Sequence, residues 1–85
     1  MNLPHIDVEA TGKNIHRLRK SNNLSVRELS NLLGFSTVQA IYKWQDGRCL
    51  PTLDNLVILS SVFHVSIDDI IIVKENNKWI WMKHQ

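Results

Sequence analysis

The chain has 85 residues, of which 44% are hydrophobic and 21% are charged, and its formal net charge is +2. This length allows one domain, because a single core forms from roughly 50 to 200 residues, and the composition excludes a disordered or collagen-like chain. No apolar run exceeds four residues, against the ~20 that a membrane helix needs, and we expect no secretion signal. The single cysteine, Cys49, cannot form an internal disulfide, which favours a reducing, cytoplasmic location.

The positive charge is concentrated in one part of the chain. Residues 11–49 contain seven of the ten Lys and Arg residues but only two of the eight acidic residues. Such a local field favours a polyanionic partner. On charge alone, an ordinary solvated surface is an equally simple interpretation.

The spacing of apolar residues predicts helices from residue 7 onwards. In the first helix, Val8, Ile15 and Leu18 share one stripe, and Asp7 is a candidate N-cap. The opposite side of that helix forms a basic face, made by Lys13, His16, Arg17 and Lys20.

The second and third predicted helices follow closely. The second begins at the capping box of Ser25 and Glu28 and ends at Gly34, which can adopt a left-handed conformation without penalty. Ser36 and Gln39 repeat the capping-box spacing, so the third helix is predicted to begin at Ser36. It buries Ile41 and Trp44 and ends at Gly47. Two short helices joined by a Gly-Phe-Ser turn are typical of a helix-turn-helix unit, whose second helix enters the major groove of DNA.

A fourth helix, capped by Thr52, is predicted to be the central and most buried one, since it is strongly apolar. Its apolar residues include Leu53, Leu56, Val57, Leu59, Val62 and Phe63. Ser66 caps a short fifth helix. Beyond it, the β-branched residues 70–73 and the polar cluster at 74–77 fit a strand or small hairpin as well as a helical tail.

The predicted fold is therefore all-α: a compact five-helix domain with a short C-terminal extension, for which a strand or hairpin and a helical tail are the alternatives. We expect a lead-in at residues 1–10, the helix-turn-helix domain at 11–73 and the extension at 74–85.

In this order and at nearly this spacing, several short motifs resemble the XRE-type (Cro and phage-repressor-like) helix-turn-helix family over residues 11–73. They are Ile15-x-x-Leu18-Arg19, Leu24-Ser25-x-x-Glu28-Leu29, Leu32-Leu33-Gly34, Ile41-x-x-Trp44-x-x-Gly47, Pro51-Thr52-Leu53-x-x-Leu56 and Val65-Ser66-Ile67-Asp68-Asp69-Ile70. The resemblance implies a lambda-repressor-like DNA-binding domain, usually a transcriptional regulator and often a dimer on a two-fold-symmetric site.

The chain departs from the family pattern at four places. Val26 stands where the family often has a glutamine that contacts the DNA backbone, and Ser30 stands where alanine is usual. Residues 35–41 are one residue longer than usual, so we expect the third helix to gain a residue at its start. His64 replaces the usual C-cap glycine, which is strained but feasible. These departures affect the individual base contacts more than the mode of binding.

With Ile41 and Trp44 facing inward, the outer face of the third helix carries Gln39, Lys43 and Asp46. Val38 and Tyr42 lie at the edge of this face. A glutamine suits adenine and a lysine suits guanine, and an apolar or aromatic group can meet a thymine methyl. The predicted base contacts are Val38, Gln39, Tyr42 and Lys43. The predicted phosphate contacts are Lys13, Arg17, Lys20, Arg27, Thr37 and Arg48. For each basic residue alone, a plain solubilising role is an equally simple interpretation.

Enzyme classes find no support in the sequence. The four histidines lack ligand spacing, the glycines are isolated, and Asp68 and Asp69 are adjacent, so their side chains point apart. Cys49 lies before a proline-containing loop with no histidine nearby. We expect no catalytic residue, no metal and no cofactor.

The sequence thus predicts a sequence-specific, double-stranded DNA-binding regulator, favoured as a repressor that covers a promoter. An antitoxin that also binds a toxin protein is an alternative. A protein-interaction module without DNA binding is another, favoured by Val26 and the small net charge. We also expect a homodimer built by Ile72, Val73 and Trp79–Met82, the alternative being a tail folded back on its own chain.

Overall fold

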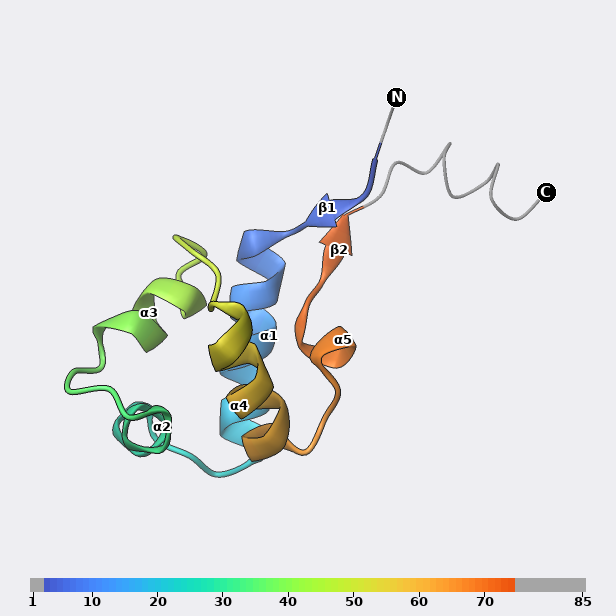
Figure 1. Cartoon of the computed structure of the whole chain (residues 1–85). Helices are drawn as coiled ribbons and strands as arrows, with labels where there is room; N and C mark the ends of the chain where they lie inside the picture. The colour runs from blue at the N-terminus through green and yellow to red at the C-terminus, as the bar shows by residue number, and fades with distance from the viewer. Residues whose placement is uncertain (1–2, 75–85) are drawn as a thin grey trace.

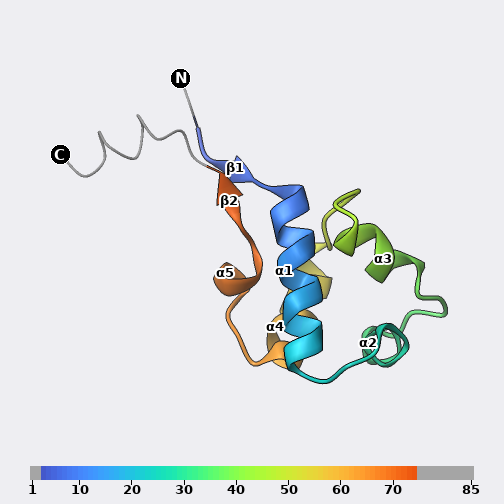
Figure 2. The same ribbon diagram turned by 180° about the vertical axis from the view of Figure 1, so that it is seen from behind.

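Helix α1 (Val8–Ser21) runs through the middle of the molecule, with α3 (Gln39–Gln45) on one side and α5 (Ile67–Ile70) on the other (Figure 1). The computed structural model describes residues 3–74. Helices α2 (Val26–Leu33) and α4 (Leu53–Phe63) complete the bundle, and Figure 2 shows the same arrangement from behind. All five predicted helices are present, so the predicted five-helix class is confirmed.

The predicted helix caps are confirmed at four helix starts. Ser25 and Glu28 form the reciprocal capping box of α2, with both hydrogen bonds at 3.0 Å. Asp7, Thr52 and Ser66 cap α1, α4 and α5 through side-chain oxygens that accept backbone N–H groups. These caps satisfy amide groups that have no partner within their own helix.

The predicted left-handed helix ends are also confirmed. Gly34 has φ +78° at the end of α2, and His64 has φ +59° at the end of α4. The chain therefore turns sharply where it leaves α2 and where it leaves α4.

The predicted start of α3 at Ser36 is wrong. This helix begins at Gln39, its N-cap is Val38, and no side chain caps it. Residues 35–38 connect α2 to α3. The first hydrogen bond of α3 runs from the Tyr42 amide to the carbonyl oxygen of Val38. The extra residue relative to the family pattern therefore lengthens the turn rather than the helix.

The core lies where the five helices meet. Its fully or nearly fully buried apolar side chains are Ile15, Leu18, Leu29, Leu33, Ile41, Trp44, Leu56, Leu59, Phe63 and Ile70. The prediction that α4 is the most buried helix is wrong, because Leu53 and Val57 are 77% and 59% exposed. The apolar residues of α4 spread around its circumference, and the neighbouring helices cover only the side that carries Leu56, Leu59 and Phe63.

The two ends of the described chain pair as antiparallel strands, β1 (His5–Ile6) and β2 (Val73–Lys74), drawn beside each other in Figure 1. The predicted strand is therefore present at residues 73–74, and its partner is the N-terminal segment. The segment Trp79–Met82, which we expected to contribute to a dimer, lies outside the described residues.

Further contacts tie this strand pair to the start of α1. The hydroxyl of Thr11 accepts the Ile72 amide at 2.9 Å, and the ammonium of Lys74 lies 3.7 Å from the carboxylate of Asp7. The hydrogen bond from the Ala10 amide, together with the charge of Lys74, lowers the pKa of the Asp7 carboxyl. The helix cap and the strand pair therefore share one carboxylate.

Within residues 3–74, no helix is long and apolar enough to cross a membrane.

Helices α1 and α3 approach each other closely at Gly12, where α1 meets the end of α3. A Cβ atom at Gly12 would overlap the carbonyl oxygen of Trp44 and lie 3.1 Å from that of Gln45. Because these neighbours are backbone atoms, they cannot move aside as a flexible side chain would. Only glycine allows α3 to lie this close to α1.

We therefore expect Gly12→Ala to reduce the free energy of unfolding by at least about 2 kcal/mol, despite the better helix propensity of alanine. Gly34→Ala is the matched control, because no heavy atom lies within 4 Å of its would-be Cβ. It should lose only about 1 kcal/mol, from its left-handed backbone. Urea unfolding measures both, and an unchanged stability of Gly12→Ala would contradict the close packing.

Candidate nucleic-acid interface

Helices α2 and α3 form the helix-turn-helix unit that the sequence predicts. After Gly34, the amide of Phe35 donates to the Ser30 carbonyl at 2.9 Å, which closes the end of α2. The Phe35 ring then meets the Trp44 ring edge-on, with 5.8 Å between ring centroids. The small residue Ser30 is buried. The turn is thus anchored from both helices, which fixes the direction of α3.

A buried arginine of α1 fixes the same helix from a second side. Arg19 is only 8% exposed, and its guanidinium donates to the Gln45 side-chain oxygen in α3 at 2.9 Å and to the Leu24 carbonyl before α2 at 2.7 Å. It therefore joins α1 to both parts of the helix-turn-helix unit. The sequence had given Arg19 no role, although its place four residues after Ile15 puts it on the buried stripe of α1.

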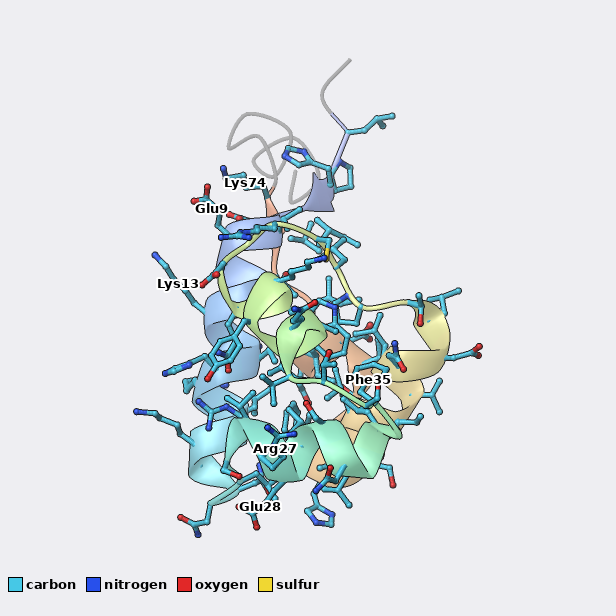
Figure 3. The ribbon with its side chains drawn as sticks, turned by 90° about the vertical axis from the view of Figure 1, so that its left-hand side faces the viewer. Glu9, Lys13, Arg27, Glu28, Phe35 and Lys74 are labelled. Atoms are coloured by element: carbon cyan, nitrogen blue, oxygen red, sulfur yellow. The ribbon has the colours of Figure 1, made fainter. Side chains whose placement is uncertain are left out.

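The outer face of α3 carries a surface hollow of about 370 Å³. It is lined by Gln39, Tyr42, Lys43, Asp46 and Arg48. Figure 3 looks onto this side of the molecule, with α3 in front and α2 below it. Three predicted base-contacting residues and one predicted phosphate-contacting residue therefore lie together. The hollow offers amide, hydroxyl and ammonium groups, the kinds of group that hydrogen-bond base edges.

Of the predicted contact residues next to α3, two lie outside this hollow. Val38 is half-buried at the start of α3, and Thr37 is exposed in the turn before it. Because α3 begins at Gln39, Thr37 lies two residues before the start of the helix.

The basic residues on α1 and α2 are less concentrated than the sequence suggested. Arg27 is exposed on α2 at the front of the view in Figure 3, and Lys13 lies towards the edge of the same view. Lys20 is exposed in the last turn of α1. All three side chains are exposed to solvent.

Arg17 is turned away from that side. Its guanidinium donates to the Asn14 side-chain oxygen at 2.7 Å, and the Asn14 amide donates in turn to two carbonyls of α5, those of Asp69 and Ile70. Since α5 lies on the opposite side of α1 from α3, Arg17 is not brought together with the hollow (Figures 1 and 2).

Asp46 is the unexpected member of the hollow. The sequence placed it on the outer face of α3 but gave it no role. Its carboxylate lies 3.8 Å from the Arg48 guanidinium, so a predicted phosphate contact is paired with an acid in this structure. In residues 3–74, no three His, Cys, Asp or Glu side chains are grouped in a way that could hold a metal ion, and Cys49 is exposed.

The chain belongs to the XRE-type helix-turn-helix family: the model of a helix-turn-helix family matches residues 15–70. The match covers α2, the turn and α3, and with them the hollow and Arg19. Members of this family are DNA-binding regulators. No curated protein sequence matches the chain closely enough to count as a relative.

Solved structures share the fold at low sequence identity. The restriction-modification controller protein C.AhdI from Aeromonas hydrophila has a TM-score of 0.67 at 20% identity, covering 75% of this chain and 96% of that one. The DNA-binding domain of BldD has a TM-score of 0.65 at 13% identity, covering 78% of this chain and 94% of that one. The clp gene regulator ClgR from C. glutamicum has a TM-score of 0.67 at 18% identity, covering 80% of this chain and 86% of that one. The architecture is therefore that of known helix-turn-helix domains.

The role of Arg19 predicts a large effect of its removal. Arg19→Met keeps most of the buried side-chain volume but leaves the Leu24 carbonyl and the Gln45 amide group without their partner, so we expect a loss of about 2–4 kcal/mol in unfolding free energy. Arg17→Met is the matched control on the same helix, because Arg17 is exposed and should lose less than about 1 kcal/mol. Equal losses in urea unfolding would contradict the anchoring role of Arg19.

Proposed function

We propose that the protein is a sequence-specific, double-stranded DNA-binding transcriptional regulator that acts in the cytoplasm as a repressor, by covering a promoter. The observation that carries the proposal is the hollow on the outer face of α3, where Gln39, Tyr42 and Lys43 lie together and exposed. The same helix is held from behind by Gly12 and Arg19, so its position is fixed before DNA arrives. Preorganisation of this kind lowers the cost of binding.

In the proposed complex, α3 lies in the major groove, which is about 12 Å wide and admits one helix. Gln39 hydrogen-bonds an adenine, Lys43 a guanine, and Tyr42 or Val38 contacts a thymine methyl. Arg27, Arg48, Lys13 and Lys20 contact phosphates on the flanks. Arg17 and Thr37 complete the predicted set of phosphate contacts, and Arg17 must leave Asn14 to take part.

The two kinds of contact predict different variant behaviour. Gln39→Ala and Lys43→Ala should each cost about 1–3 kcal/mol on the preferred duplex and much less on random DNA, because only base contacts discriminate between sequences. Arg48→Ala should weaken binding to both duplexes alike and reduce the slope of log affinity against log salt by up to about 1. Selection from a random duplex pool supplies the preferred site, and titrations at several salt concentrations give the affinities.

Equal losses of Gln39→Ala on preferred and random DNA would remove Gln39 from the base-reading set. Failure of the wild-type chain to bind any duplex would contradict the proposed function as a whole.

We further propose that the regulator binds its site as a homodimer. Large apolar side chains remain exposed on α4, at Leu53 and Val57, and near the strand pair, at Ile72 and Val73. Exposed apolar groups of this size are a liability for a small domain unless a partner covers them. A two-fold dimer would place two copies of α3 on half-sites about one DNA turn apart.

Sedimentation equilibrium tests the dimer. The wild-type chain should sediment as a dimer, and Val57→Glu should be a folded monomer, because a charge cannot be buried in an apolar contact without a large cost. Leu32→Glu is the control, since Leu32 is an equally exposed leucine on α2, at 55%. A dimeric Val57→Glu, or a monomeric wild-type chain, would contradict the dimer or its location on α4.

A further inference from the structure

Asp46 has no evident structural reason for its place in the hollow. It is the C-cap residue of α3, where the negative end of the helix dipole disfavours an acid. Among residues 3–74, the polar interaction of its side chain is the 3.8 Å ion pair with Arg48, and both partners are more than half exposed. Exposed pairs of this kind contribute little to stability. The fold therefore gains little from the carboxylate.

The surroundings of Asp46 make an acid costly for the proposed function as well. Its carboxylate lines the same hollow as Lys43 and Arg48, the groups that would face a polyanion. A negative charge there repels phosphates directly, and it also occupies the one guanidinium that lines the hollow. Both effects oppose DNA binding regardless of sequence.

We propose that Asp46 is a positioning residue that holds Arg48 away from the DNA phosphates and so lowers the affinity for duplexes of every sequence. Binding exchanges the Asp46–Arg48 pair for an Arg48–phosphate pair, and Asp46 makes this exchange less favourable. Because the loss is the same for every sequence, the ratio of specific to non-specific affinity is unchanged, and the effect of Asp46 is on overall affinity. The inference rests on the proposed function and goes beyond it by assigning a role to an acid.

Asp46→Asn tests the inference, because it removes the charge and keeps the size of an exposed side chain. At 0.1 M salt, affinity should rise about three- to eightfold for the preferred duplex and for random DNA alike. The salt dependence should steepen by a fraction of the ~0.9 that one phosphate contact contributes, because Arg48 already makes part of that contact in the wild type. Asp68→Asn is the matched control. It removes the same charge from α5, on the other side of α1 from α3, and should change affinity less than about twofold.

A double variant separates the pairing mechanism from simple charge. In an Arg48→Ala background, Asp46→Asn should raise affinity by less than about twofold, because only the direct repulsion between the carboxylate and the phosphates remains to be removed. The inference is overturned if Asp46→Asn binds like the wild type, if its full gain persists without Arg48, or if Asp68→Asn gives the same gain. A loss on the preferred duplex alone would overturn it too, because Asp46 would then read a base. Thermal unfolding checks that each variant is folded.

These outcomes also separate this inference from the proposed function. A wild-type chain that binds duplexes, with an unaffected Asp46→Asn variant, overturns only the role of Asp46. A wild-type chain that binds no duplex overturns both.

Discussion

The contact between α1 and α3 at Gly12 is the constraint on which the rest of the molecule depends. A Cβ atom at this position would overlap the backbone of Trp44, so the two helices can approach only because the residue is glycine. Arg19, two turns further along α1, adds hydrogen bonds to Gln45 and to the Leu24 carbonyl. The inner face of α3 is thereby fully used in packing, with Ile41 and Trp44 buried in the core. Its outer face is left free for a ligand.

This division explains which residues of α3 serve the fold and which do not. Ile41, Trp44 and Gln45 have partners in α1 or in the core. Gln39, Tyr42, Lys43 and Asp46 line the hollow instead. These side chains are not needed for the fold, and they lie together on one exposed face of a helix. Such a face is suited to recognise a ligand. In a family whose members bind DNA, the major groove is the surface that such a helix fits.

The sequence predicted the parts of the structure that depend on neighbouring residues. The capping box of Ser25 and Glu28 and the left-handed Gly34 were correct because each involves residues within one turn. The same spacing at Ser36 and Gln39 predicted a helix start that does not exist, because residues 35–38 are needed to cross from α2 to α3. The spacing of neighbouring residues does not show how many residues the connection between the two helices needs.

Features that depend on distant residues could not be predicted in the same way. The strand at residues 73–74 was one of the alternatives. Its partner strand at residues 5–6 is its neighbour in space but lies at the other end of the domain in sequence. The exposure of Leu53 and Val57 depends on which side of α4 its neighbours cover. For the candidate site, Gln39, Tyr42 and Lys43 followed from helical spacing alone, whereas the partners of Arg19 and Arg17 required the tertiary structure.

The central claim is that the outer face of α3, fixed against α1, is the surface that meets duplex DNA. Backbone amide chemical shifts of the labelled protein, recorded during titration with its selected duplex, test this most directly. The claim predicts that the largest changes fall at Gln39, Tyr42, Lys43 and Arg48, with small changes in α5 and the strand pair. Changes centred on α5 or on β1 and β2, with α3 unaffected, would contradict it.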